Sequence, residues 1–259
     1  MLKSILVTKN NGVALITMSD AVTMNAVTDP VMLEDLIQAF KDIAQDDSVR
    51  VCVLTGVDRA FSSGGNVKDM LSREKMFAGE PLVLQEGYRE GIHRLSKLMY
   101  SFEKPLIAAV NGAAVGAGFD LAMLCDLRIA SDQARFGSTF VNLAIIPGDG
   151  GAWLLSKVVG AQRAAELVLT GRIIKADEAL EMGLLLNVVA ADALIDEAML
   201  LAQSIACKSA DSLRLAKRLL NSTDRLNFTD HLELCAANQA MLHHAPEHEA
   251  ALKDFFKKR

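Results

Sequence analysis

One aspartate stands alone in an apolar segment. Residues 119–125 are apolar at every position except Asp120. A helix that is apolar on all sides is buried, so we expect the Asp120 carboxyl to lie near a helix start with little water around it. Because an unpaired buried charge is costly, this carboxylate either caps the backbone of the first helical turn or performs acid–base chemistry.

The backbone just before this aspartate favours the catalytic interpretation. Gly116 and Gly118 flank Ala117, and glycines let a main chain approach a ligand closely. The N–H groups at a helix start then form a site for an anion or a developing oxyanion. We therefore interpret Asp120 as an acid or base placed beside an oxyanion donor.

A second glycine loop has the same placement in the chain. Residues 61–66, FSSGGN, follow an apolar strand-like run and precede a helical segment that begins near Val67. Two such loops can direct two backbone N–H groups at one oxygen. Two donors on a thioester oxygen would stabilise the enolate that forms when the neighbouring carbon loses a proton. The donors that we expect are Gly65 and Ala117.

The elements that must position these loops alternate between strand and helix. Strands are predicted over 5–9 and 12–18, joined by an Asn10-Asn11 turn, and over 50–55, 106–110, 127–130 and 185–190. Helical spacing covers 31–45, 81–101, 119–125, 152–158, 161–170 and 176–182. After residue 192 only helices are predicted, over 193–206, 210–220, 229–242 and 247–257. This order predicts an α/β core over 1–191 and an all-helical region over 192–259.

The last helices carry more apolar residues than one buried face needs. Surplus apolar surface implies a partner surface, and identical subunits usually close a symmetric ring. We therefore expect a homotrimer or a hexamer.

Composition excludes several other classes. The chain has 259 residues, a net charge of −5 and no basic stripe, which argues against nucleic-acid binding. No apolar run approaches the about 20 residues of a membrane span, and the N-terminus lacks a signal-peptide pattern. The four cysteines form no CxxC pair and the five histidines no HExxH motif, so we expect a cytoplasmic enzyme with no metal and no separate cofactor.

Three common nucleotide and hydrolase motifs are also missing. A dinucleotide-binding loop requires Gly or Ala at residue 121, where Leu121 stands. The chain contains neither the GxSxG motif of serine hydrolases nor a Walker A loop.

The whole set of motifs resembles the crotonase family, the enoyl-CoA hydratase/isomerase superfamily. The matching segments, in order, are MNAV (24–27), FSSGGNVKDM (61–70), KPLIAAVNGAAVGAGFDLAMLCDLRIAS (104–131), FG (136–137), IPGDGG (146–151), LTGRIIKADEALEMGLLLNVV (168–189) and FFKKR (255–259). The resemblance implies a spiral of ββα units, with C-terminal helices that build trimers or hexamers. It also implies an acyl-CoA thioester as substrate, with coenzyme A being part of the substrate.

The resemblance assigns roles to individual residues. It places the oxyanion donors at Gly65 and Ala117, the pair that the two loops predict. It places coenzyme A along one group of residues: Met24, Ala26, Ser63, Gly65, Asn66 and Val67. Lys257 and Lys258 are candidates to contact the CoA phosphates, although surface lysines are common at chain ends.

Four positions depart from the usual hydratase pattern. Asp120 replaces the first of two catalytic glutamates, and Phe140, which transfers no proton, replaces the second. Asn66 replaces an aspartate in the oxyanion loop. Asp149, in the PGDGG loop, is an additional carboxylate that either supplies the second acid–base group or is an Asp-Gly turn residue.

These departures leave three functions open. Hydration of a 2-enoyl-CoA is our main prediction, with Asp120 and Asp149 as catalytic residues and Phe140 in the substrate-binding wall. A double-bond isomerase needs only one base. A non-catalytic acyl-CoA-binding homologue would explain Phe140 but not two aspartates in apolar surroundings.

Overall fold

The main sheet of the protein has six strands. In the computed structural model, which describes residues 2–257, the strand order is β1-β2-β3-β5-β7-β10. The bounds are β1 Ile5–Asn10, β2 Val13–Met18, β3 Val51–Gly56, β5 Leu106–Val110, β7 Leu127–Ser131 and β10 Asn187–Val189. Within this sheet, as far as the described residues form it, only the β1–β2 pair is antiparallel. The central strands β3 and β5 are buried on both faces, as their continuous apolar runs predict.

The hairpin turn lies one residue later than predicted. Asn10 pairs with Val13, so Asn11 and Gly12 form the turn, with φ of 48° and 80°. Two-residue turns with positive φ at both positions match the twist of the flanking strands, and glycine adopts such angles readily.

A second sheet of four short strands lies beside the first. Its order is β4-β6-β8-β9, with β4 Ala60–Ser62, β6 Ala113–Val115, β8 Arg135–Gly137 and β9 Ile174–Lys175. Each of β4, β6 and β8 directly follows a strand of the main sheet, so the strand pair is repeated along the chain. The sequence did not predict any of the four strands β4, β6, β8 and β9, because two or three residues are too few for a period of two to be visible.

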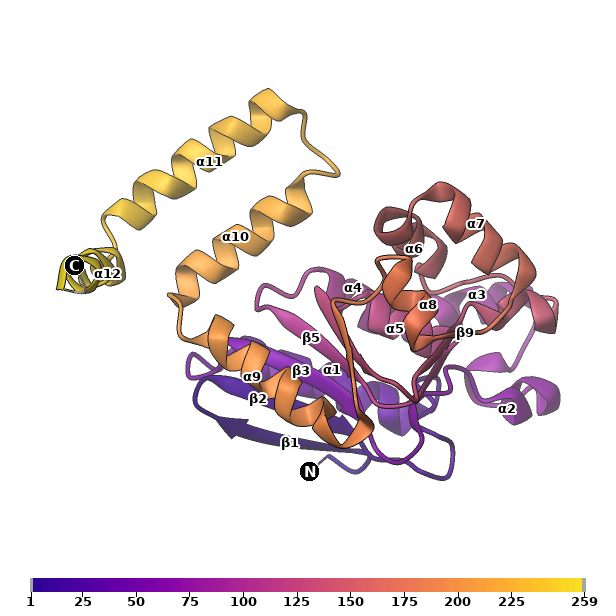
Figure 1. The fold of residues 1–259 in the computed structure, drawn as a ribbon. Coiled ribbons are helices and arrows are strands. Elements are labelled where there is room, and N and C mark those ends of the chain that lie inside the picture. Colours follow the sequence, from indigo (N-terminus) through magenta and orange to yellow (C-terminus); the bar gives the residue numbers. More distant parts are fainter. Residues whose placement is uncertain (1, 258–259) are drawn as a thin grey trace.

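Helices connect the strands, and α3, α5, α6, α7 and α8 lie together on one side of the main sheet (Figure 1). Their bounds are α1 Pro30–Ala44, α2 Val67–Ser72, α3 Pro81–Glu90, α4 Ile92–Tyr100, α5 Ala117–Met123, α6 Gly151–Val159, α7 Ala161–Thr170 and α8 Ala176–Glu181. Single 3-10 turns cover Lys75–Phe77, Thr139–Leu143 and Ala191–Ala193.

The prediction of one helix over 81–101 is wrong in one respect, because the segment forms two helices, α3 and α4. The chain breaks at Gly91, which has φ −102° and ψ −115°. A β-carbon at this position would approach Gly87 O to 2.5 Å, so only glycine allows the backbone conformation that separates the two helices.

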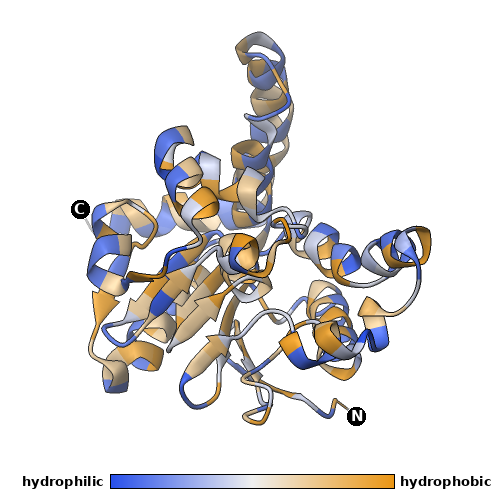
Figure 2. Ribbon diagram, turned by 90° about the vertical axis from the view of Figure 1, so that its right-hand side faces the viewer, coloured by the Kyte–Doolittle hydropathy of each residue, from blue (hydrophilic) through white to orange (hydrophobic). Residues whose placement is uncertain are grey.

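The core has two parts, one on each face of the main sheet. The larger part packs α1, α4 and α5 against residues such as Ile16, Leu54 and Ala108. The smaller part packs α9 (Leu194–Ala206) against the other face, through Leu194, Ala198, Ala202 and Ala206. Figure 2 shows the sheet strands coloured mostly as hydrophobic, whereas the surrounding helices alternate between hydrophobic and hydrophilic residues.

The last three helices project away from the sheet (Figure 1). They are α10 Ala210–Ser222, α11 Phe228–His243 and α12 Pro246–Lys257. Because α9 covers the sheet, the helices that stand apart begin with α10 rather than at residue 192. The buried Lys217 ties α10 to the core through Asp126, at 2.7 Å, and through the Lys104 carbonyl, at 2.9 Å.

Candidate functional site

Asp120 is the most deeply buried carboxyl of the site. It lies in α5, whose seven residues are all buried, and its side chain is 2% exposed. Oδ2 has no hydrogen-bond partner among the described residues. Burial raises the pKa of Asp120 well above its usual value of 3.8, the charge of Asp149 adds to this effect, and the Gly151 backbone N–H opposes it. An unsatisfied buried oxygen of this kind is available to a ligand.

Asp149 is the second buried carboxyl at this place. It lies in the loop before α6, is 8% exposed, and its Oδ1 is also unpartnered within residues 2–257. Burial raises the pKa of Asp149 to about 6, while the nearby His93 lowers it. The Asp149 charge acts on Asp120, and Gly151, two residues after Asp149, lies against the Asp120 carboxyl. The structure therefore brings the two predicted carboxylates together.

The two glycine loops are in direct backbone contact. A β-carbon on Gly64 would lie 2.7 Å from Ala117 N, and one on Gly118 would lie 2.2 Å from Ser62 O. Only glycine permits this approach. Ala117 is the first residue of α5, where backbone N–H groups have no acceptor within the helix. Gly65 lies in the other loop and directly follows Gly64, the glycine that contacts the Ala117 backbone.

Hydrogen bonds hold the loop at 62–66 against the segment at 24–26. Ser63 N–H donates to Met24 O at 2.8 Å, and Ser62 Oγ donates to Asn25 O at 2.7 Å. Ala26 and Gly64 form an isolated parallel β-bridge. The residues predicted to bind coenzyme A, which come from two segments far apart in the chain, thus lie side by side along the contact between these segments.

Asn66 and Val67 lie where this contact meets α2. The Asn66 backbone N–H donates to Thr28 Oγ1 at 3.0 Å, and its side chain accepts from Lys68 N at 3.0 Å. Asn66 is therefore the N-cap of α2, a role that asparagine and aspartate fill equally well. Val67, the first residue of the helix, is exposed.

Phe140 lines the site beside the loop at residues 116–118, where an oxyanion donor was predicted. It lies in the 3-10 turn Thr139–Leu143 and is buried. A β-carbon on Gly116 would meet its ring at 3.9 Å. The position thus presents an apolar ring, not an acid, next to Ala117.

Two residues that the sequence did not single out also face this site. His93 Nε2 lies 2.8 Å from Gly148 O, in the loop that carries Asp149. Burial and the charge of Asp149 raise the pKa of Tyr88. Tyr88 lies on α3 and His93 on α4, both half-buried, and no local pattern marks either as part of a site.

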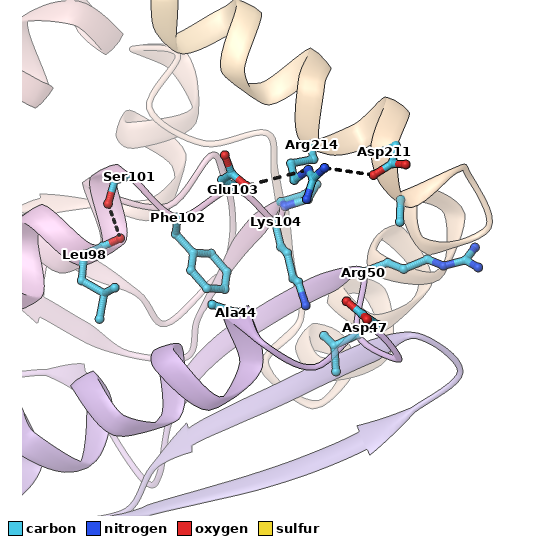
Figure 3. Close-up of a pocket in the computed structure, with 13 residues that line it drawn as sticks. Ala44, Asp47, Arg50, Leu98, Ser101, Phe102, Glu103, Lys104, Asp211 and Arg214 are labelled. Carbon is cyan, nitrogen blue, oxygen red and sulfur yellow. Dashed lines mark hydrogen bonds and ion pairs between the residues drawn. The ribbon is translucent and has the colours of Figure 1, made fainter. Parts of the chain in front are cut away.

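A pocket of about 220 Å³ lies elsewhere, between α1, the α4–β5 loop and α10 (Figure 3). None of the predicted site residues lines it. Arg214 bridges Glu103 and Asp211 across its upper side, and the Lys104 ammonium donates to Ile43 O at 2.6 Å and to Asp46 O at 2.7 Å. Arg214 and Lys104 already have partners within the protein and are not free to bind an anionic ligand. We therefore interpret the pocket as part of the junction between the core and α10.

The remaining predictions concern the chain end and bound ions. Lys257 ends α12 and pairs with Asp254 at 3.6 Å, far from α2 and α5 in Figure 1. Lys258 lies outside the described residues. Residues 2–257 contain neither a group of three or more His, Cys, Asp or Glu side chains placed to hold a metal ion nor a helix long and apolar enough to cross a membrane.

Comparison with known proteins identifies the family. The model of the enoyl-CoA hydratase/isomerase family matches residues 8–259. The chain belongs to this family. It is 31% identical to the 2,3-dehydroadipyl-CoA hydratase of Escherichia coli over 225 residues, which are 87% of this chain and 84% of that protein.

Solved structures agree with this family assignment. The crystal structure of the Bacillus anthracis enoyl-CoA hydratase matches 99% of this chain and 97% of its own, with a TM-score of 0.92 and 30% identity. An enoyl-CoA hydratase subunit from Geobacillus kaustophilus matches 100% and 96%, with a TM-score of 0.90 and 31% identity. The fold predicted from the sequence, a crotonase-like α/β core with C-terminal helices, is confirmed.

Proposed function

We propose that this protein is an enoyl-CoA hydratase that adds water reversibly to a 2-enoyl-CoA thioester. The observation that carries this proposal is the pair of buried carboxyls, Asp120 and Asp149, each with an unpartnered oxygen. Addition of water to the double bond needs two acid–base groups, because one must take a proton from the water and the other must give a proton to the substrate. The pair supplies both, although Phe140 occupies the position of the usual second glutamate.

The proposed reaction requires no metal and no separate cofactor. One carboxylate takes a proton from the water while the water oxygen bonds to C3 of the substrate. The electron pair of the double bond moves toward the thioester, whose oxygen accepts hydrogen bonds from the N–H groups of Gly65 and Ala117. The other carboxyl, protonated at the start, then delivers its proton to C2, so the product carries the complete water molecule.

Coenzyme A is proposed to bind along the contact between the segments at 24–26 and 62–66. The residues involved are Met24, Ala26, Ser63, Gly65, Asn66 and Val67, which the hydrogen bonds described above hold in one row. Phe140 would contact the acyl group near the thioester. An apolar ring there excludes bulk water, which strengthens the hydrogen bonds to the developing charge.

Isomerisation of the double bond is the second candidate. Phe140 favours it, because moving a proton between two carbons needs one base and no held water. Under this alternative Asp120 works alone and Asp149 is a turn residue. The depth of Asp149 supports hydration instead, since turn aspartates are ordinarily solvated.

Proton NMR in deuterated solvent separates the candidates. The wild type is incubated with a short 2-enoyl-CoA, beside Asp120→Asn and Asp149→Asn. Hydration predicts a 3-hydroxyacyl product and loss of about 10²- to 10⁴-fold in each variant, the usual contribution of one acid–base group. Isomerisation predicts exchange of α- or γ-protons that Asp149→Asn leaves intact. Hydration that survives Asp149→Asn would contradict the assignment of this aspartate, and a wild type with neither activity would favour a non-catalytic binding protein.

We also propose a homotrimer, or a hexamer of two trimers, in the cytoplasm. Support comes from α10–α12, where Leu220, Phe228, Leu232 and Met241 are exposed on helices that project from the sheet. A second subunit would cover these side chains.

A further inference from the structure

The loop that carries Asp149 is attached to the core by very few hydrogen bonds. Between residues 146 and 149, the only hydrogen bond to another part of the described chain is donated by the His93 side chain, from Nε2 to Gly148 O at 2.8 Å. Gly148 and Gly150 flank Asp149, and Gly150 has φ +99°. Glycines on both sides give the backbone many accessible conformations, so the position of the Asp149 carboxyl depends on whatever holds this segment.

His93 is well placed to hold it. The residue lies in the first turn of α4, between the buried Ile92 and Leu95, which anchor the helix in the core. A carbonyl oxygen only accepts hydrogen bonds, so Nε2 must carry the proton and donate it. The Tyr88 ring packs 5.9 Å from the His93 ring and also lies against Gly148, which limits the orientations that the imidazole can take.

We propose that His93 is the positioning residue of the second carboxylate: its Nε2–H holds the Gly148 carbonyl and thereby aims Asp149 at Asp120. This inference rests on the proposed hydratase function for its catalytic consequence, but not for the geometry. His93 does not touch the reacting atoms. His93 instead fixes the distance between the Asp120 and Asp149 carboxyls, so that a water molecule fits between them.

The groups that face Asp149 come from three helices. Asp120 lies on α5, Tyr88 on α3 and His93 on α4. Of these, only His93 can carry a positive charge, and it acts against the effect of burial on the Asp149 carboxyl. Loss of the imidazole should therefore change the titration of Asp149 as well as its position.

Three substitutions at residue 93 test the proposal. Glutamine keeps an N–H donor of similar reach, asparagine has a shorter donor, and leucine has none. We expect His93→Leu and His93→Asn to lower kcat for hydration by about 10²-fold, the effect of displacing a catalytic group by about 1 Å, with KM within about twofold. His93→Gln should retain most of the rate. The exposed Lys97, on the same helix, provides the matched control Lys97→Ala, which should behave as the wild type.

Two results would overturn the proposal. One is equal hydration rates in His93→Gln and His93→Asn, because donor reach would then be irrelevant. The other is a parallel loss of hydration and acyl-CoA binding in every variant, which indicates a structural role. If His93→Leu does not fold, the Gln and Asn pair still decides.

A readout without activity separates this proposal from the hydratase assignment. Carboxyl ¹³C NMR of aspartate-labelled protein identifies Asp149 as the resonance absent from Asp149→Asn. In His93→Leu this resonance should titrate at higher pH than in the wild type, and in Lys97→Ala at the same pH. His93→Gln keeps the donor but removes the charge, so a titration that is displaced in His93→Leu and less displaced in His93→Gln would retain the positioning role, even in a protein that hydrates no thioester. Equal displacement in the two variants, or none in either, would reject the positioning role.

Discussion

Gly151 lies so close to Asp120 that no side chain fits between them. A β-carbon built on Gly151 would overlap all three atoms of the Asp120 carboxyl group. The backbone N–H of Gly151 hydrogen-bonds the same carboxyl. The loop that ends at α6 and the helix α5 are therefore fitted to one another at the point where the two carboxyls meet.

Replacement of this glycine should inactivate the enzyme without unfolding it. In Gly151→Ala the methyl group displaces the Asp120 carboxyl, and we expect kcat for hydration to fall by about 10²-fold. Affinity for a non-reactive acyl-CoA, measured by calorimetry, should stay within about threefold. Ala152→Ser, one residue later and exposed, is the control. Unchanged kcat in Gly151→Ala would show that the position of Asp120 does not matter.

Removal of the Asp149 charge should stabilise the fold. A pKa raised from 3.8 to about 6 means that the folded state binds this proton more tightly than the unfolded state. Stability is therefore lost as pH rises from about 4 to 6, and the loss is complete above that window. Asp149→Asn should raise the free energy of unfolding at pH 8 by about 1–3 kcal/mol and change little at pH 3.5.

Urea unfolding at both pH values measures this effect. Asp132→Asn, at an exposed aspartate, is the control and should be neutral. A destabilised Asp149→Asn at pH 8 would mean that the carboxylate makes a favourable contact that its burial does not suggest.

Hydration should have a bell-shaped dependence on pH. The reaction needs one ionised and one protonated carboxyl. As pH falls below about 6, Asp149 becomes protonated, and the raised pKa of Asp120 also favours its protonated form, so the base is lost. At high pH both carboxyls ionise and the acid is lost. Since the two groups interact, kcat/KM against pH reports apparent pKa values of the pair, and a rate that rises continuously below pH 6 would contradict the scheme.

The proposed oxyanion donor at Ala117 can be removed by substitution, because this residue is the first of α5. Proline occurs at the first position of helices but has no N–H, so Ala117→Pro removes the donor at the start of α5. We expect kcat to fall by about 10²- to 10³-fold, the cost of one oxyanion donor. Ala117→Gly keeps the N–H and should retain at least a third of the rate. Equal losses in the two variants would indicate that only packing at residue 117 matters.

Assembly through the projecting helices predicts a specific response to a charge. Leu232 is half exposed on α11, and Leu232→Glu places a carboxylate in the expected subunit contact. Sedimentation should give a trimer or hexamer for the wild type and smaller species for this variant. The neighbouring exposed Glu233 gives the control Glu233→Gln. A monomeric wild type at micromolar concentration would contradict the proposed assembly.

The sequence alone determined the class of fold and most of its elements. Strand β5 and helix α7 have the predicted bounds, because a run of five buried apolar residues and a ten-residue amphipathic stretch are both strong local signals. Gly65, Ala117 and Asp120 could be proposed because glycines beside a strand end and one acid in an apolar helix are visible in the sequence.

Only the tertiary structure decided which groups meet. That Asp149 faces Asp120 depends on the packing of α6 against α5, which no local pattern encodes. His93 and Tyr88 reach the same place from two helices that the sequence presented as one. Short strands such as β4 and β6 form because the second sheet pairs them, not because of their own propensity. Contacts between segments distant in the chain are properties of the fold. The sequence could propose Asp120 and Asp149 as a pair, but only the structure placed the two carboxyls together.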